Sequence, residues 1–244
     1  MTMTTSPEAS TAARRALVVT AHPDDVDFGS AGTIASWVAD GVQVTYCVCT
    51  AGDAGGFDDT PRADMPRIRQ DEQRSAAAAV GVTDVQFLGY EDGRVTANLQ
   101  LRRDITRVIR QVRPHRVISH SPEINWAHLP TSHPDHRAVG EATLAAIYPD
   151  ARNGFAHPEL LQEGLQPWTV SELWMSESPE ERINHAVDIT DFFDAKLAAL
   201  SAHRSQTEHL DDLQGMIRRH LARTAERHGM AGRLAEAFHV VDTS

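Results

Sequence analysis

The sequence predicts an α/β fold, with a parallel sheet, helices on both of its faces and C-terminal helices packed alongside. Short apolar runs alternate with helix-length segments at least four times over residues 16–147, and this alternation is typical of right-handed βαβ units. The length of 244 residues suits one large domain. Apolar residues make up 41% and charged residues 23% of the chain, a globular composition that argues against a coiled coil or a collagen-like repeat.

The first elements of the pattern lie before residue 66. Residues 16–21 form a short apolar run without turn residues, which indicates a buried strand. A helix is expected over residues 32–40, ended by Gly41, and a second strand over residues 42–50. Residues 51–66 are rich in glycine, aspartate and proline and predict a loop.

The alternation continues through the middle of the chain. A polar and then alanine-rich helix is expected over residues 68–80, followed by a strand at residues 85–88. Residues 99–112 have apolar residues at helical spacing, and Pro114 lies just beyond them. A fourth strand is centred on residues 117–118.

The rest of the chain is less regular. A proline-rich loop over residues 121–134 precedes a helix at 135–147. Residues 150–167 are interrupted by proline and glycine, and residues 170–175 predict one more strand. Two helices follow, with apolar faces at Phe193, Leu197 and Leu200 in the first and at Leu210, Leu213, Ile217 and Leu221 in the second. The whole pattern is that of a Rossmann-like sheet.

The charge of the chain excludes several classes of partner. Arginine and lysine number 23 against 34 aspartates and glutamates, a formal net charge of −11. No basic run is present, so we expect no nucleic-acid partner and no anionic membrane surface. No apolar run is long enough to span a membrane, and residues 1–15 contain no signal-peptide core. We therefore expect a cytoplasmic protein with a disordered tail at residues 1–15 and a single domain over residues 16–244.

The two cysteines, Cys47 and Cys49, exclude a disulfide framework. They are two residues apart in a predicted strand, so both side chains face the same side. We interpret them as small buried hydrophobic residues.

Two similar motifs follow predicted strands. His22-Pro23-Asp24-Asp25 comes directly after the first strand, and His133-Pro134-Asp135-His136 follows the fourth. Open α/β sheets bind ligands at the carboxyl ends of their strands. The glycine-rich turn of a dinucleotide-binding site is missing from the first of these positions, because Gly29-Ser30-Ala31-Gly32 does not fit its spacing.

The motifs offer His22, Asp25 and His136 as a metal site of two imidazoles and one carboxylate. Catalytic zinc is usually held by three protein ligands with one position left open. Iron(II) is an alternative, because the affinity order of metals does not separate the two. The other interpretation is that these are helix-capping residues, since Asp135 precedes a helix. Matching motifs after two strands of one sheet favour the metal site.

At these motifs the chain resembles the LmbE/PIG-L family of zinc-dependent deacetylases, which remove N-acyl groups from glucosamine-type sugars. The resemblance extends from about Leu17 to Gln206 and is most specific at residues 21–29 and 133–136. Weaker agreement occurs at residues 50–53, 69–72, 87–93 and 203–206.

The resemblance implies a role for each residue of the motifs. It implies zinc ligands at His22, Asp25 and His136, and a general base at Asp24. It implies that His133, protonated and oriented by Asp135, stabilises the transition state. Its implied substrate-binding residues are Arg69, Asp92 and Asp53.

Two departures from the family pattern bear on the substrate. Val26 stands where an acidic residue often follows the paired aspartates, and Thr131-Ser132 stand near the second motif where some members have a tyrosine. His120 and His128 flank the second motif, and Trp126 is a candidate to stack on a sugar ring.

The function implied is the hydrolysis of an N-acyl, mainly N-acetyl, group on a glucosamine-type sugar or conjugate. Zinc-bound water would attack the amide while Asp24 takes its proton. One alternative is an amidase that cleaves a larger amide such as a thiol conjugate. Another, of a different class, is a Rossmann-like binding module without catalysis. The partner expected is a small amino-sugar substrate, and a homo-oligomer is left open.

Overall fold

The computed structural model describes residues 14–244, which surround a seven-stranded sheet. The strand order is β3-β2-β1-β4-β5-β7-β6. The first five strands in this order are parallel, whereas β7 is antiparallel to both β5 and β6. The strands are β1 (Arg15–Thr20), β2 (Gln43–Thr50), β3 (Asp84–Tyr90), β4 (Arg116–His120), β5 (Glu172–Ser176), β6 (His185–Asp188) and β7 (Ala235–Asp242).

The α/β prediction is confirmed, and the sheet is mixed, because β7 is antiparallel to β5 and to β6. The strands β6 and β7 were not foreseen. β6 has only four residues, and the sequence of β7, Ala-Glu-Ala-Phe-His-Val-Val-Asp, includes two acidic residues and a histidine. Neither strand therefore forms the continuous apolar run by which the buried parallel strands were recognised.

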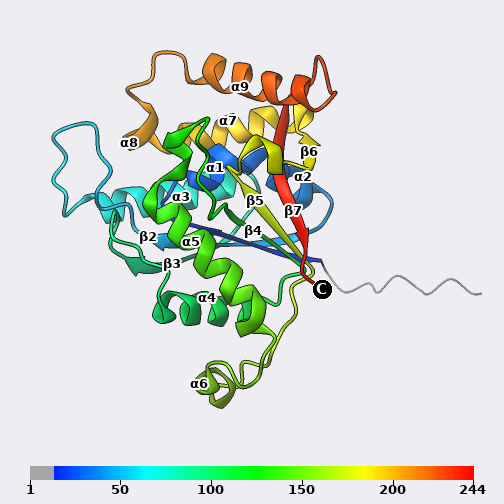
Figure 1. Ribbon diagram of the computed structural model, residues 1–244. Coiled ribbons are helices and arrows are strands. Elements are labelled where there is room, and N and C mark those ends of the chain that lie inside the picture. Colours follow the sequence, from blue (N-terminus) through cyan, green and yellow to red (C-terminus); the bar gives the residue numbers. More distant parts are fainter. Residues whose placement is uncertain (1–13) are drawn as a thin grey trace, which may run out of the picture.

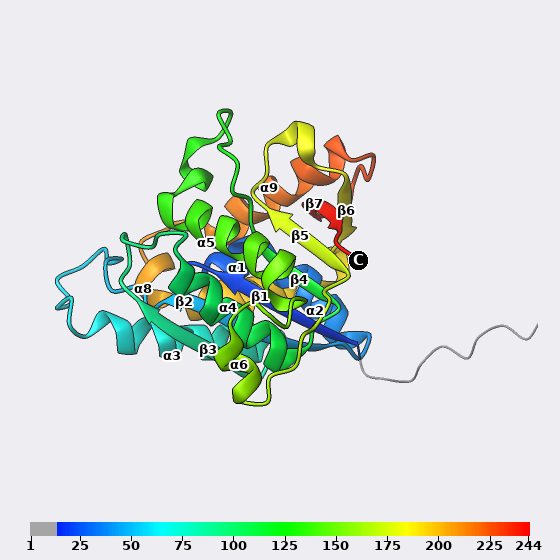
Figure 2. The same cartoon turned by 60° about the horizontal axis from the view of Figure 1, so that its bottom comes forward.

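Helices cover both faces of the sheet (Figures 1 and 2). α4 and α5 pack on one face, and α2, α3 and α7 pack on the other. α9 lies on the outside of α7 and shares a small apolar cluster with it. The helices are α1 (Asp25–Gly29), α2 (Ala31–Ala39), α3 (Met65–Ala79), α4 (Leu99–Val112), α5 (Pro134–Ala145), α6 (Pro158–Gln162), α7 (Phe193–Ala202), α8 (Arg204–Thr207) and α9 (Leu213–Arg227).

The central strand β1 shows how the two layers form. Leu17 and Val19 point into the core under α4 and α5, whereas Ala16 and Val18 point to the opposite core. Successive side chains of a strand face opposite sides, so an unbroken apolar run supplies both cores.

Most predicted elements lie close to their observed bounds. The helix predicted over residues 99–112 has the same bounds as α4. The Asn98 side chain caps the start of this helix by accepting a hydrogen bond from Leu101 N. The expected loop before α5 contains a short 3₁₀ turn at Leu129–Ser132, and the irregular segment 150–167 contains α6. The predicted tail at 1–15 falls largely on residues 1–13, outside the described part of the chain, and Arg15 already belongs to β1. No helix of residues 14–244 is long and apolar enough to cross a membrane.

The only lysine of the sequence, Lys196, is buried between α7 and β7. Its ammonium donates to Glu236 Oε1 at 2.7 Å and to the carbonyl oxygens of Asp27 and Phe28 at 2.8 and 2.7 Å. Glu236 also accepts hydrogen bonds from the backbone N–H groups of Gly32 and Thr33 at the start of α2. This ion pair ties the last strand to the helices that follow β1.

We expect Lys196→Met to lower the free energy of unfolding by about 3–5 kcal/mol, because it leaves the Glu236 carboxylate buried without its partner. Arg219→Ala is the control, since Arg219 pairs with Asp212 at the exposed surface of α9 and should change the stability much less. Urea unfolding of both variants measures the difference. Equal stability of the two variants would contradict a structural role for the Lys196 pair.

Candidate metal centre

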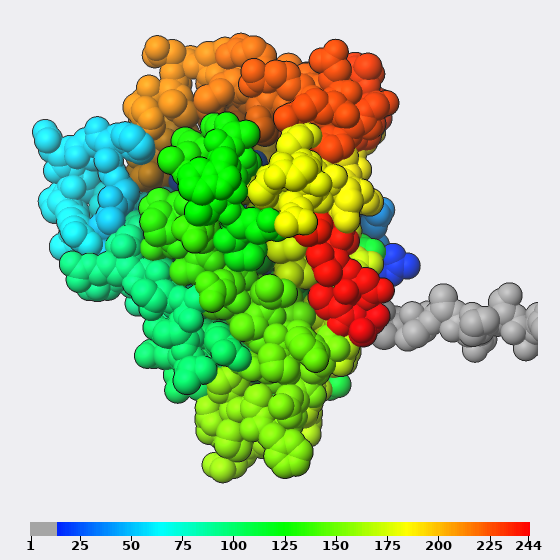
Figure 3. Space-filling view, in the orientation of Figure 1, coloured from blue at the N-terminus to red at the C-terminus, as the bar shows by residue number. Residues whose placement is uncertain are grey.

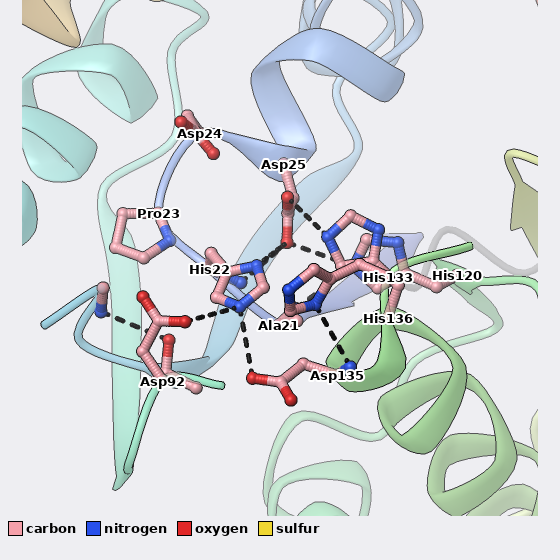
Figure 4. A network of polar contacts seen from close by, with 12 residues as sticks. Ala21, His22, Pro23, Asp24, Asp25, Asp92, His120, His133, Asp135 and His136 are labelled. Carbon is pink, nitrogen blue, oxygen red and sulfur yellow. Dashed lines mark hydrogen bonds and ion pairs between the residues drawn. The ribbon is translucent and has the colours of Figure 1, made fainter. Parts of the chain in front are cut away.

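The two predicted motifs meet at the carboxyl ends of β1 and β4 (Figure 4). These strands are neighbours in the middle of the sheet, and the chain leaves them in opposite directions, toward β2 and toward β5. Such a point is where open α/β sheets form a ligand crevice. Residues far apart in the sequence, His22 and His136, come within 5.3 Å of each other between ring centroids.

The backbone at Asp24 explains why the adjacent aspartates diverge. Asp24 has a φ of 92°, in the left-handed region, which costs energy for a residue with a side chain. Its N–H donates to Gln73 Oε1 at 2.8 Å, and the next carboxylate, Asp25 Oδ2, accepts from His22 N at 2.7 Å. The Asp24 carboxylate therefore lies beside Arg69, at 3.2 Å from Nη2, while the Asp25 carboxylate faces the imidazoles.

Asp25 is the centre of the predicted ligand set. Its Oδ1 lies 3.1 Å from His136 Nε2, and its Oδ2 lies 3.4 Å from His22 Nδ1. The structure thus brings His22, Asp25 and His136 together around one carboxylate. His133 lies close as well, because ligand atoms of His22, His133 and His136 all fall within 4.8 Å of one another.

His120, treated in the sequence only as a flanking residue, is the buried last residue of β4. It forms another possible ligand group with Asp25 and His136. Its Nε2 lies 3.2 Å from Asp25 Oδ2 but also accepts a hydrogen bond from the backbone N–H of Ala21 at 3.1 Å, which occupies the lone pair that a metal would need, and its Nδ1 lies 2.9 Å from Glu177 Oε2. We therefore assign His120 to holding the strand ends and favour the set built on His22.

The electrostatics of the cluster favour a cation. Burial lowers the pKa of His22, but Asp25, Asp135 and Asp92 together raise it to about 12. Burial likewise lowers the pKa of His136, while Asp25 and Glu177 raise it to about 10. Burial alone would raise the pKa of Asp25, yet the two imidazoles hold it well below its usual range.

These imidazoles would thus carry protons that neutralise the surrounding carboxylates. A divalent metal can replace those protons, because metal ligands bind as neutral imidazole and as carboxylate. Two imidazoles and a carboxylate that converge from rigid strand and helix ends fit such an ion. Glu177, which lies 3.1 Å from the other ring nitrogen of His136, would orient that ligand.

We expect from the resemblance that Asp135 orients the His133 ring. In the structure, however, the Asp135 carboxylate makes no hydrogen bond to that ring. Its Oδ2 accepts from Gly93 N at 2.7 Å and lies 3.3 Å from His22 Nε2, and its Oδ1 accepts from Val95 N at 3.2 Å. His133 instead folds back as the N-cap of α5, and its Nδ1 accepts from the backbone N–H of Asp135.

The N-cap position of His133 determines which nitrogen of its neutral ring carries the hydrogen. Because Nδ1 accepts a hydrogen bond, the hydrogen of the neutral ring lies on Nε2. Burial and the positive charges of His22 and His136 lower the pKa of His133. This argues against the protonated His133 that we had expected.

The expected substrate residues all have internal partners. Arg69 is only 4% exposed and donates to Pro23 O at 2.6 Å and to Gly52 O at 3.2 Å. Asp92 Oδ1 lies 3.1 Å from His22 Nε2. Asp53 accepts from Asp92 N at 2.9 Å and from Arg62 at 2.8 Å. These three residues therefore help to hold the loops that carry the motifs. Arg69 and Asp92 also lie beside the cluster of His22 and the paired aspartates.

A buried chain of side chains behind Asp24 was missed. Gln73, which fixes Asp24 N, donates through Nε2 to Asp27 Oδ2 at 2.8 Å, and His203 Nε2 lies 2.7 Å from the same oxygen. The sequence could have indicated Gln73, because it is one helical turn beyond Arg69 and lies on the same face of α3. Glu177 had no such signal, since it lies in an irregular segment after β5.

Several known proteins similar to this chain are deacetylases. Residues 17–147 match the model of the PIG-L family, described as GlcNAc-PI de-N-acetylase. The chain is 33% identical to a probable N-acetyl-alpha-D-glucosaminyl L-malate deacetylase 2 of Bacillus cereus, with 84% of this chain and 90% of that protein covered. It is 31% identical to a 1D-myo-inositol 2-acetamido-2-deoxy-alpha-D-glucopyranoside deacetylase 1 of Saccharopolyspora erythraea, with 81% and 79% covered.

A solved structure is similar over nearly the whole chain. The N,N'-diacetylchitobiose deacetylase from Pyrococcus horikoshii superposes with a TM-score of 0.85 at 28% sequence identity. The match covers 95% of this chain and 85% of that one. The similarity therefore includes the C-terminal helices and strands beyond the family model.

Proposed function

This chain belongs to the PIG-L family, and on that premise we propose that it is a metal-dependent deacetylase acting on an N-acyl glucosamine or its conjugate. The observation that carries the proposal is the divergence of Asp24 and Asp25, which puts one carboxylate among imidazoles and leaves its neighbour outside the ligand set. The names of the relatives, which act on N-acetylglucosamine compounds, support the choice of substrate class.

His22, Asp25 and His136 would hold the metal, with zinc the ion that this donor set suits best and iron(II) the alternative. A bound divalent ion supplies Lewis acidity toward a carbonyl oxygen and a water molecule. Arg69 and Asp92 beside the cluster, with Asp53 behind Asp92, would contact or position the sugar.

Asp24 is placed to act as the general base. Burial raises the pKa of Asp24 to about 6, with Arg69 opposing the rise. The carboxylate would accept a proton from the attacking water as the new C–O bond forms, and then pass it to the amine nitrogen as the C–N bond breaks. The immediate products are the free amine of the sugar and a carboxylic acid, acetic acid for an N-acetyl group. One proton of the water thus passes through Asp24 to the nitrogen, and the acid then gives up the second proton, which leaves a carboxylate and an ammonium group.

His133 would donate a hydrogen bond from its neutral Nε2–H to the carbonyl oxygen as negative charge develops there. The N-cap bond to Asp135 N fixes the ring with this hydrogen directed away from the helix. Removal of one such donor typically costs about 10²–10³-fold in kcat.

The function is tested by amine release from N-acetylglucosamine and its methyl glycoside, using protein loaded with zinc. We expect metal-dependent release of amine that a chelator abolishes. A protein that binds one metal per chain but releases no amine from any N-acyl glucosamine would overturn the proposal.

His133→Ala is expected to lower kcat about 10²–10³-fold and to leave the metal content unchanged. His133→Gln should recover part of the loss, because its amide N–H can still donate. The alkaline limb of the pH profile should keep its position in both variants, since a neutral donor does not ionise. Loss of that limb in His133→Ala would assign a proton transfer to His133 instead, and loss of metal would make it a ligand.

A further inference from the structure

We propose that Gln73 is the positioning residue of the general base: together with Arg69 it fixes the peptide group between Pro23 and Asp24 and so keeps the Asp24 carboxylate outside the metal cluster. The inference rests on the proposed function, because it concerns the base of that reaction. Gln73 would act through Asp24 and would contact neither the metal nor the substrate.

The backbone at Asp24 needs support from outside its own turn. Its φ of 92° and ψ of −28° are strained for a residue with a side chain. Asp24 is the N-cap of α1, and its carbonyl oxygen accepts from Asp27 N and Phe28 N at 2.8 and 3.0 Å. An N-cap residue usually accepts such a bond with an extended backbone, so these bonds do not select the observed φ.

Two side chains of α3 hold both polar groups of one peptide bond. Pro23 O accepts from Arg69 Nη2 at 2.6 Å, and Asp24 N donates to Gln73 Oε1 at 2.8 Å. The C=O and N–H groups of a trans peptide lie in one plane and point in opposite directions, so two such partners fix the plane. The ring of Pro23 fixes its own φ. The orientation of the plane therefore sets the ψ of Pro23 and the φ of Asp24.

The buried face of α3 shows that Gln73 does more than fill space. Its other members are Met65, Arg69, Ala76 and Ala77, so Arg69 and Gln73 are the polar residues of this face. Gln73 is fully buried. Burial of an amide costs free energy unless its hydrogen bonds are made, and packing alone would favour an apolar residue. The glutamine is therefore explained by the bonds that its amide makes.

The two ends of the Gln73 amide are held in the required orientation. Oε1 accepts from Asp24 N, while Nε2 donates to Asp27 Oδ2 at 2.8 Å. The same oxygen of Asp27 lies 2.7 Å from His203 Nε2. A carboxylate accepts hydrogen bonds and does not donate them, so Asp27 selects the orientation in which Oε1 faces Asp24.

The residues behind Gln73 are enclosed. Asp27 and His203 are both fully buried. Figure 3 shows the cyan loop after β2 and the orange segment from α8 to α9 at the surface, with little of the blue helix α1 visible between them. Water therefore does not compete for these bonds, and the support is rigid.

This support determines where the base lies. Figure 4 shows the Asp24 carboxylate apart from the imidazoles that surround Asp25. Rotation of the peptide before Asp24 would change the direction of its side chain relative to His22. The Asp25 carboxylate has an anchor of its own, the hydrogen bond from His22 N at 2.7 Å. Loss of Gln73 should therefore displace the base more than the metal ligands.

Gln73→Met removes both hydrogen bonds and keeps the length of the side chain. We expect kcat to fall about 10–10²-fold, since a small misplacement of a reacting group is enough for such a loss. KM and metal content should stay close to those of the wild type. Gln70→Met is the matched control, because it makes the same change on α3 at a residue whose Oε1 accepts from Arg74 at the exposed surface. The control should keep the wild-type kcat, and a wild-type kcat in Gln73→Met would overturn the proposal.

A double-mutant cycle separates positioning from a general loss of structure. If Gln73 acts through the Asp24 carboxylate, Gln73→Met should leave the residual kcat of Asp24→Asn nearly unchanged. A merely structural role would lower kcat by the same factor in both backgrounds, and that result would also overturn the proposal.

Asp27 offers a conservative variant and a disruptive one. Asp27→Asn keeps an oxygen for Gln73 and His203, and its amide nitrogen would replace Oδ1, which has no hydrogen-bond partner within residues 14–244. It should retain most of the wild-type kcat. Asp27→Leu leaves the Gln73 amide without its orienting partner and should lower kcat as Gln73→Met does. Equal kcat in the two variants would overturn the orienting role of Asp27.

Hydrogen exchange needs no turnover, so it separates this inference from the deacetylase function. Exchange of the Asp24 amide, followed by NMR, should be faster in Gln73→Met than in the wild type and in Gln70→Met, because the amide has lost its partner. Faster exchange without amine release by the wild type would refute the function but support the hold of Gln73 on the turn. Equal exchange in the three proteins would overturn the inference even if the wild type releases amine well.

Discussion

Asp24→Asn is expected to lower kcat by about 10²–10⁴-fold, the usual contribution of a general base, while the protein keeps its metal. Asparagine preserves the size and polarity of the side chain, so the hydrogen bond from Asp24 N to Gln73 and the strained turn should survive. What is lost is the ability to accept a proton. Steady-state kinetics and elemental analysis on the same preparation measure both quantities.

The pH profile adds a second readout for Asp24. The base must be ionised to work, so kcat/KM should rise with pH through its pKa. Burial raises the pKa of Asp24 to about 6, and a metal cation beside it would lower it again. We therefore expect the acid limb at or below about pH 6, and we expect Asp24→Asn to remove this limb from the residual activity.

Asp71→Asn is a suitable control, because Asp71 is exposed on α3 and pairs only with Arg74 at the surface. It should leave kcat and the acid limb unchanged. Near-normal kcat in metal-loaded Asp24→Asn would show that another group takes the proton.

Asp25→Ala is expected to remove the metal and, with it, activity down to the uncatalysed background. Asp25 is the residue that touches both His22 and His136, so its loss removes one ligand and the contact that positions the other two. Substitution of a residue behind a metal ligand typically weakens binding by about 10–100-fold, and removal of a ligand should exceed this. Elemental analysis after dialysis against a weak chelator measures the loss, and circular dichroism verifies the fold.

Two further variants define the ligand set. His136→Ala should behave like Asp25→Ala, whereas His133→Ala should retain the metal although its ring lies within 5.3 Å of the His136 ring between centroids. Glu177→Gln should weaken metal binding by only about 10–100-fold, because it removes a hydrogen-bond partner of the ligand His136 and no ligand. Full metal content in His136→Ala would refute the assignment, and metal loss in His133→Ala would favour the set of three imidazoles.

Local sequence patterns were sufficient to predict the elements that carry the site. The unbroken apolar run before His22 predicts a strand buried on both faces, and β1 is such a strand. Helical spacing over residues 99–112, with Pro114 just beyond, predicts the bounds of α4. The place of both motifs at strand carboxyl ends follows from the same alternation, since it depends only on residues close in the chain.

Tertiary structure alone decided which side chains meet. His203 and Asp27 share a hydrogen bond across 176 residues, and Glu177 reaches His136 from a segment that no local pattern marks. The Asp135 carboxylate lies beside His22 because the backbone N–H groups of Gly93 and Val95 hold it there. The direction of a side chain depends on partners from distant elements, so the sequence by itself determined the strands, helices and motif residues, and packing determined their contacts.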